Sequence, residues 1–349
     1  MSGTARIRVL VIDDSPHSRQ TISALLQRSP LVEVIGHARD GEEALRMALE
    51  LSPDLATLDL EMPRMDGFTL LRLLMSRCPL PVIVISGHAG DGDVFKALEL
   101  GAVDFIAKPG TRAVAELASI EQELIRKVHG VRRLRIDRIA ERLRARAPRS
   151  PLAAGGAAPR AVAIGASTGG PRALMELFSA WVDPVPSCFL VAQHMPEGFT
   201  RGFAERLDRL TCFRAGEAQG GEALVPGTIW VAPGGSHLAL ESRDGRIVTR
   251  VEAAAPGDRH VPSVDRLFES AAKQLGSSLL AVVLTGMGDD GSRGVQCVRA
   301  VGGAVIAEAE ATAVIYGMPK QALATGCVDR QLPLHEIPAA ICASREARR

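Results

Sequence analysis

Residues 9–14 read Val-Leu-Val-Ile-Asp-Asp, a short apolar run that ends in two acids. Four more apolar runs follow before residue 108, and amphipathic stretches of helical period lie between them, such as residues 18–28 and 42–51. The five strands predicted in this way cover residues 9–12, 31–35, 55–58, 82–85 and 105–107. Short strands that alternate with helices predict an α/β unit built on a doubly wound, five-stranded parallel sheet.

Polar side chains stand at the ends of four of these strands. Asp13 and Asp14 follow the first strand, Asp59 the third, Ser86 the fourth and Lys108 the fifth. The functional crevice of an open parallel sheet lies beyond the carboxyl ends of its strands, so these side chains should converge there. A single acid at a strand end is often only a solvated loop residue, but these positions taken together favour a shared site.

Converging carboxylates repel one another and favour a hard divalent cation, and Mg²⁺ prefers oxygen ligands. With the cation bound, Asp59 could attack a phosphoryl group as a nucleophile and form an acyl phosphate. Lys108 would pair with the phosphoryl oxygens. The Ser86 hydroxyl would bond to one of them and draw its loop inward, which is how a switch would operate.

These residues, together with the run Asp59-Leu60-Glu61-Met62-Pro63-Arg64-Met65-Asp66-Gly67, resemble the signature of two-component receiver domains, whose fold is flavodoxin-like. The resemblance implies that Asp59 is phosphorylated by a sensor histidine kinase. It also implies that Asp14 binds Mg²⁺ directly, that Asp13 assists, and that Asp59 and the backbone carbonyl of Glu61 complete the protein ligands.

A second alternation of strands and helices begins at residue 161. Predicted strands cover residues 161–164, 189–192, 229–231, 237–240, 247–251, 279–284 and 304–306, and helical patterns cover 172–178, 200–210, 264–273 and 293–301. This region is again α/β, with a mostly parallel sheet and a hairpin-rich insertion near its middle.

The first of these strands runs into Gly165-Ala166-Ser167-Thr168-Gly169-Gly170-Pro171. Glycines permit a tight strand-to-helix turn, and the Gly-x-Ser-x-Gly spacing matches a nucleophile elbow. Pro171 suits the first turn of a helix. A phosphate-binding loop and a plain glycine-rich turn are the other interpretations of this segment, although the Walker sequence is absent.

Two further strand ends favour a nucleophilic serine. Residues 189–192 lead into His194, and residues 279–284 lead into Asp289 and Asp290. Ser167, His194 and one aspartate would supply nucleophile, general base and orienting carboxylate, with no cofactor. The backbone amides around Thr168 and Met287 are candidates for the oxyanion hole. Ordinary α/β-hydrolases run Ser, Asp, His along the chain, so the order here indicates another lineage.

The order and the motifs resemble the CheB methylesterases of chemotaxis, through residues 164–171, 193–200, 232–238, 262–268, 285–291 and 316–319. The resemblance implies that Asp290 is the catalytic acid. It implies hydrolysis of glutamate methyl esters on methyl-accepting chemotaxis receptors, with glutamine deamidation beside it, activated by phosphorylation of the receiver. Predicted domains are the receiver at 6–128, an Arg-rich helical connector and flexible linker at 129–158, and the catalytic domain at 159–345.

Composition narrows the remaining classes of protein. The net charge is +1, and nine arginines in residues 130–160 lack interleaved aromatic residues, so we expect a solvated helix face and no nucleic-acid partner. The six cysteines are scattered, which predicts free thiols. No apolar stretch approaches a membrane span and no signal peptide is visible, so we expect a cytoplasmic protein without membrane insertion.

Two other functions stay open at this point. A response regulator whose output is binding would need a helix-turn-helix or a basic output domain. An inert scaffold on a hydrolase fold would lack one of Ser167, His194 or Asp290, and all three are present. Aromatic residues make up 3% of the chain, so we expect cores built from Ala, Val, Leu and Ile.

Overall fold

The computed structural model describes residues 5–86, 92–108, 114–130 and 161–343. The chain divides into two compact units, residues 1–146 and 147–349, and each is described by itself. The predicted connector at 129–158 lies outside the described residues, apart from its start at the end of helix α5. The side chain of Ser86 and the loop that follows it also lie outside them.

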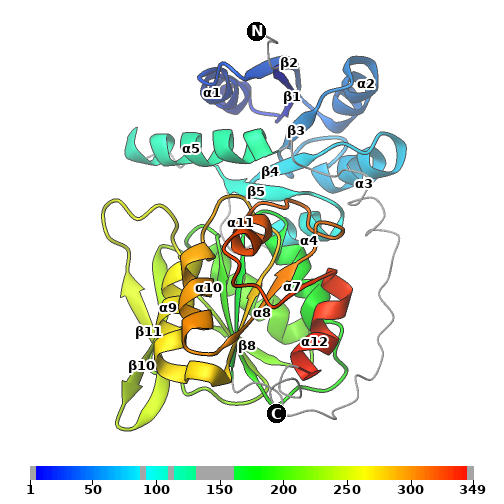
Figure 1. Ribbon diagram of the computed structural model, residues 1–349. Helices are drawn as coiled ribbons and strands as arrows, with labels where there is room; N and C mark the ends of the chain where they lie inside the picture. The colour runs from blue at the N-terminus through cyan, green and yellow to red at the C-terminus, as the bar shows by residue number, and fades with distance from the viewer. Residues whose placement is uncertain (1–4, 87–91, 109–113, 131–160, 344–349) are drawn as a thin grey trace. The chain divides into compact units, whose positions relative to one another are not determined.

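The first unit is a five-stranded parallel sheet in the order β2-β1-β3-β4-β5 (Figure 1). Its strands are β1 (Ile7–Ile12), β2 (Val32–Ala38), β3 (Leu55–Leu58), β4 (Val82–Ser86) and β5 (Asp104–Ala107). Its helices are α1 (Pro16–Gln27), α2 (Gly41–Leu51), α3 (Gly67–Arg77), α4 (Gly92–Glu99) and α5 (Val114–Gly130). The strand order confirms the predicted doubly wound receiver fold.

The second unit contains a seven-stranded sheet in the order β14-β13-β12-β6-β7-β9-β8, and every pairing in it is parallel. The strands are β6 (Ala161–Ala166), β7 (Cys188–Gln193), β8 (Arg214–Glu217), β9 (Thr228–Val231), β12 (Leu279–Val283), β13 (Ala304–Glu308) and β14 (Arg330–Leu332). Strands β10 (Ser236–Arg243) and β11 (Arg246–Ala253) form a separate antiparallel hairpin, as the insertion predicts.

Helices connect these strands and cover the sheet. They are α7 (Gly170–Phe178), α8 (Phe199–Leu210), α9 (Val264–Leu275), α10 (Ser292–Ala300), α11 (Met318–Ala324) and α12 (Ile337–Ala343), with 3-10 turns η2 (Gly276–Ser278) and η3 (Leu334–Glu336). Strands β6, β7 and β12 are buried along their whole length, which is typical of parallel strands covered on both faces.

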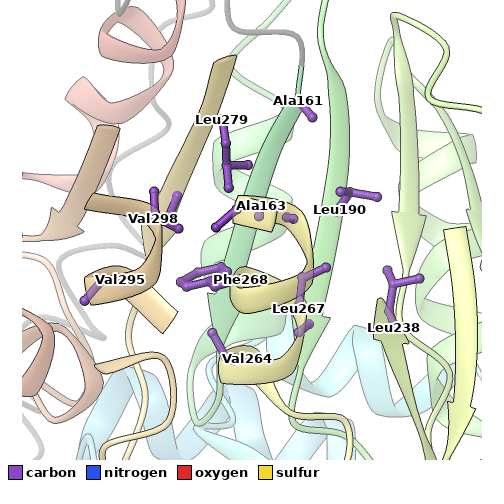
Figure 2. Close-up of a cluster of buried hydrophobic side chains, with 14 of the residues drawn as sticks. Ala161, Ala163, Leu190, Leu238, Val264, Leu267, Phe268, Leu279, Val295 and Val298 are labelled. Atoms are coloured by element: carbon purple, nitrogen blue, oxygen red, sulfur yellow. The ribbon is translucent and has the colours of Figure 1, made fainter. Parts of the chain in front are cut away.

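Helix α9 packs on one face of the sheet through an apolar stripe (Figure 2). Its Val264, Leu267 and Phe268 point toward small side chains on β6 such as Ala163. The approach is so close that a Cβ on Gly165 would lie 2.2 Å from the Val264 side chain. Glycine at position 165 is therefore required by this packing.

The opposite face corrects one expectation from composition. Phe178, Trp181, Phe189 and Phe213 form a cluster in which neighbouring ring centroids lie 5.0–6.3 Å apart. The aromatic residues are few, but four of them gather at this place, and most of their ring pairs meet edge to face, an arrangement that aromatic rings prefer. The core on the α9 face is thus mainly aliphatic, with Phe268 among its side chains, whereas this aromatic cluster lies on the other face.

The edge strands β8 and β14 were absent from the predicted set. Their sequences are Arg-Ala-Gly-Glu and Arg-Gln-Leu, and most of their residues are at least partly exposed. They lack the apolar run that marks a central strand, and their pairing depends on the neighbour inside the sheet.

All six cysteines are free thiols, as predicted. Among the described residues, 5–86, 92–108, 114–130 and 161–343, no helix is both long and apolar enough to cross a membrane.

Candidate active site

Strand β6 lies at the point where the strand order of the second sheet reverses. Its partners are β7 on one side and β12 on the other. The register pairs Ala166 with Gln193, so Ser167 and His194 are the next residues along their strands. Ligands of open parallel sheets bind at such switch points. The predicted serine and histidine therefore follow two adjacent strands where chemistry is expected.

Three hydrogen bonds hold the backbone N–H and carbonyl of Ser167. Its N–H donates to the Thr285 carbonyl at 3.0 Å, and its carbonyl accepts from Gly170 N at 2.8 Å and from Gln193 Nε2 at 2.9 Å. The same Gln193 Nε2 donates to the His194 carbonyl at 3.0 Å. Gln193 thus ties the backbones of the serine and the histidine together. Ser167 itself is 3% exposed.

The His194 imidazole bonds to the Asp290 carboxylate through Nε2, at 2.8 Å from Oδ2. Asp290 is an acceptor when ionised, so Nε2 carries the proton and Nδ1 keeps a lone pair. Nδ1 is buried and has no hydrogen-bond partner among the described residues. This arrangement leaves Nδ1 as the basic atom, whereas the chymotrypsin triad uses Nδ1 toward the acid and Nε2 toward the serine. No hydrogen bond joins Ser167 to His194 within the described residues, a looseness that is common before substrate binds.

Asp290 also caps helix α9. Its Oδ2 accepts from Val264 N at 2.8 Å, and its Oδ1 accepts from Asp265 N at 2.9 Å and from Ser263 Oγ at 3.1 Å. Burial alone would raise the pKa of the Asp290 carboxyl. The His194 hydrogen bond and charge, with the Asp265 and Val264 amides, outweigh burial and hold that pKa below its usual range.

Helix α10 is capped in return from α9. Asp265, in the first turn of α9, accepts from Gly291 N at 2.9 Å and from Gly294 N at 2.7 Å. Helix α9 therefore receives a carboxylate at its N-terminus from Asp290, in the loop just before α10, and α10 receives one from Asp265 of α9. The helix dipole favours negative charge at both places. These mutual caps fix Asp290 in the chain segment that must meet His194.

Of the predicted oxyanion residues, Thr168 directly follows the serine, and the role of both Thr168 and Met287 stays a prediction. Thr168 is 3% exposed, and its Oγ1 is a buried hydroxyl with no partner within the described chain. Met287 is half-buried and follows Gly286. A Cβ on Gly286 would lie 2.8 Å from Ser167 Cβ, so glycine is needed for this close approach.

In the first unit, the predicted receiver residues come together as the strand-end rule implies. Lys108 Nζ hydrogen-bonds to Asp59 Oδ2 and lies 3.1 Å from Asp13 Oδ2. Burial raises the pKa of Asp59, opposed by Lys108. Burial would lower the pKa of Lys108, but Asp59 and Asp13 together raise it.

The acids of the first unit fit a divalent cation. Carboxylate oxygens of Asp13, Asp14 and Asp59 lie within 4.8 Å of one another. Asp13 Oδ2 is buried and has no hydrogen bond, although Lys108 lies within ion-pair distance. Glu61 N donates to Asp59 Oδ1 at 3.3 Å, and the use of its carbonyl as a ligand stays a prediction. Orphaned carboxylate oxygens in such a cluster suit Mg²⁺.

Both units are similar to known protein families. Residues 162–341 match the family model for the CheB methylesterase, and residues 9–118 match the response regulator receiver domain. A Myxococcus xanthus (strain DK1622) relative named protein-glutamate methylesterase/protein-glutamine glutaminase 1 is 47% identical over 350 residues, covering 100% of both chains. The chain belongs to the CheB methylesterase family. A Geobacter sulfurreducens relative, named protein-glutamate methylesterase/protein-glutamine glutaminase 3, is 48% identical over 94% of this chain and 95% of its own.

A solved member of the CheB family shares the fold of the second unit. The crystal structure of the Thermotoga maritima CheB methylesterase catalytic domain is 38% identical, with a TM-score of 0.51. The match covers 53% of this chain and 98% of that one.

Three further residues of this CheB-family site escaped the sequence analysis. Gln193 bridges two main chains, Ser263 bonds Asp290, and His260 stacks on His194. The sequence of residues 262–268 resembles the family, but no spacing rule relates Ser263 to Asp290, which lies beyond the following strand. The role of each follows from side-chain direction, which a linear pattern does not contain.

Proposed function

We propose that this protein hydrolyses methyl esters of glutamate side chains on chemotaxis receptors and deamidates receptor glutamines, under control of receiver phosphorylation. The observation that carries the proposal is the His194–Asp290 hydrogen bond, which leaves a buried basic Nδ1 beside the strand end that bears Ser167. The full-length similarity to relatives named for both activities supports the choice of substrate.

In this proposal Ser167 Oγ attacks the ester carbonyl carbon while His194 Nδ1 takes the hydroxyl proton. The tetrahedral intermediate collapses, the C–O bond to methoxide breaks, and His194 returns the proton so that methanol leaves. Water then adds to the acyl-enzyme by the same route and frees the glutamate and Ser167. Ammonia replaces methanol as the leaving group in deamidation.

Asp290 keeps the proton on Nε2 and stabilises the imidazolium that forms in each step. The amide and hydroxyl of Thr168, and the amide of Met287, are the proposed donors to the oxyanion. The buried, unpartnered Thr168 Oγ1 supports this assignment, because burying a hydroxyl without a hydrogen bond is unfavourable until a ligand supplies one.

We further propose that a sensor histidine kinase phosphorylates Asp59. Asp13, Asp14, Asp59 and the Glu61 carbonyl would hold Mg²⁺, which neutralises charge on the incoming phosphoryl group. Lys108 would release Asp13 and pair with a phosphoryl oxygen, and Ser86 would bond another. Phosphorylation activates the second unit if it favours an arrangement in which the catalytic site is accessible. We propose that the protein acts in the cytoplasm.

The test is methanol release from methylated receptor membranes of the same organism. Purified full-length protein is compared with and without Mg²⁺ and a small phosphodonor, beside Ser167→Ala and Asp59→Ala. The proposal expects release that rises with phosphodonor, disappears in the serine variant and loses its stimulation in the aspartate variant. Release that persists in Ser167→Ala, or no release from folded protein, would overturn it.

A further inference from the structure

His260 lies face to face with the catalytic histidine. The His194 and His260 ring centroids are 4.7 Å apart, and the ring planes differ by 3°. His260 also lies over the loop that precedes Asp290, since a Cβ on Gly288 would be 3.9 Å from its ring. The His260 ring therefore covers one face of the imidazole whose edge bonds Asp290.

The loop that carries His260 is fixed at both ends by one buried residue. His237 is fully buried, its Nε2 bonds Asp258 Oδ2 at 2.9 Å, and its Nδ1 accepts from Ser263 N at 3.0 Å. Asp258 also accepts from Ala255 N at 2.7 Å and from Arg266 Nη2 at 2.7 Å. The segment between Ala255 and Ser263 is thus anchored on both sides of His260, and the stack does not depend on a free loop.

A cavity of about 570 Å³ lies against His260. Its lining includes Asp258, His260, Asp289 and Asp290, but neither Ser167 nor His194. The His194 side chain is only 7% exposed. His260 therefore lines a polar cavity and at the same time stacks on His194, which does not reach that cavity.

His194, His260 and Asp290 could also be taken for metal ligands, because their nitrogen and oxygen atoms lie within 4.8 Å of one another. The ring planes argue against this. Imidazole lone pairs lie in the ring plane, so two parallel stacked rings do not aim them at one point between the rings. Nε2 of His194 is moreover already engaged with Asp290.

We propose that His260 is a positioning residue, whose ring fixes the plane of His194 by stacking so that Nε2 meets Asp290 while Nδ1 serves Ser167. This inference rests on the proposed function. Catalysis is sensitive to ångström displacements of the reacting groups, and an imidazole bonded only along its edge can still rotate about its side-chain bonds. The flat face of His260 removes that freedom.

The experiment compares His260→Phe, which keeps a flat ring, with His260→Leu, which has similar bulk but no ring. Both are made in the full chain and assayed for methanol release and for the rate of Ser167 labelling by a fluorophosphonate. We expect His260→Leu to lower kcat and labelling about 10- to 100-fold with KM nearly unchanged. His260→Phe should retain most of the wild-type rate. His335, an exposed histidine of the same unit, gives the matched control His335→Leu, with no expected change.

A spectroscopic readout separates positioning from folding. The His194 Nε2 proton bonded to Asp290 should give a low-field NMR signal that is protected from exchange in wild type and His260→Phe, and lost or rapidly exchanging in His260→Leu. Equal rates in wild type and His260→Leu, or a Phe variant as slow as the Leu variant, would overturn the inference. Failure of the proposed function is distinct, because wild type itself would then release no methanol.

Discussion

Replacing Asp290 with Asn tests the double role of this carboxylate as triad acid and helix cap. Oδ2 accepts from His194 Nε2 and Val264 N, and Oδ1 accepts from Asp265 N and Ser263 Oγ. An amide has one oxygen, so its NH₂ must face either Val264 N–H or Asp265 N–H. In either orientation one backbone donor loses its acceptor.

The expected loss of stability follows from these contacts. A buried donor without a partner costs about 1–3 kcal/mol, and loss of a carboxylate at a helix N-terminus costs roughly 0.3–1 kcal/mol more. We therefore expect Asp290→Asn to lower the free energy of unfolding by about 1–4 kcal/mol. The kcat should fall about 10³- to 10⁴-fold, because the amide either selects the wrong tautomer or leaves the imidazolium without a counter-charge.

The effect of pH on stability has a definite sign. The pKa of Asp290 in the folded protein is below the usual aspartate value of 3.8. Its stabilising contribution is therefore complete above that value and is lost as pH falls toward the folded pKa. Asn does not titrate, so the difference in unfolding free energy between wild type and variant should be constant near neutral pH and shrink below about pH 4.

Urea unfolding followed by tryptophan fluorescence measures this difference, because both tryptophans, Trp181 and Trp230, lie in the second unit. Asp289→Asn is the matched control. Among the described residues the neighbouring Asp289 is exposed and its side chain makes no hydrogen bond to the cap, so its variant should behave like wild type. An Asp290→Asn protein as stable and as active as wild type would refute the reasoning. So would a stability difference that does not narrow in acid.

Three more predictions follow from single contacts. Gly286→Ala would place a methyl group 2.3 Å from Met318 Sδ and 2.8 Å from Ser167 Cβ. Because this contact would displace Ser167, kcat in the ester assay should fall about 10²-fold. An unchanged kcat would contradict the packing argument. Lys127→Met leaves buried Asp104 without its cation and should lower the stability of the first unit by about 3–5 kcal/mol. Hydrogen exchange in β5 measures this loss, and unchanged stability would contradict the role of the buried ion pair. Burial raises the pKa of the Cys188 thiol to about 11. When the protein is treated with iodoacetamide at pH 8, mass spectrometry should therefore detect modification of Cys188 only after the protein has been unfolded. Rapid labelling of the native protein would contradict this prediction, because it would show that the thiol is accessible.

Most of the fold could be predicted because central parallel strands are continuous apolar runs. Strand β3 matches its predicted bounds, and β6 and β7 differ by one or two residues at their ends. The edge strand β14 could not be found in this way, since its three residues carry no apolar run and take their conformation from β13.

The parts of the candidate site that directly follow strands could be predicted from the sequence. Ser167, His194 and Asp290 follow three neighbouring strands, and the sheet brings their segments together. Which imidazole nitrogen meets Asp290 depends on a side-chain rotation, and the His260 stack depends on a loop held by buried His237. Neither leaves a pattern in the sequence. The oxyanion roles of Thr168 and Met287 stay predictions.

The mutual caps of α9 and α10 bear on how activity should be judged in related sequences. A copy of this domain that had ceased to hydrolyse anything would still need a carboxylate at position 290, because the N-terminus of α9 needs its acceptor. Selection for folding alone would retain it. The presence of Asp290 is thus a poor indicator that a related domain is catalytically active. The side chains of Ser167 and His194 cap no helix, so loss of either residue is the better sign of an inactive domain.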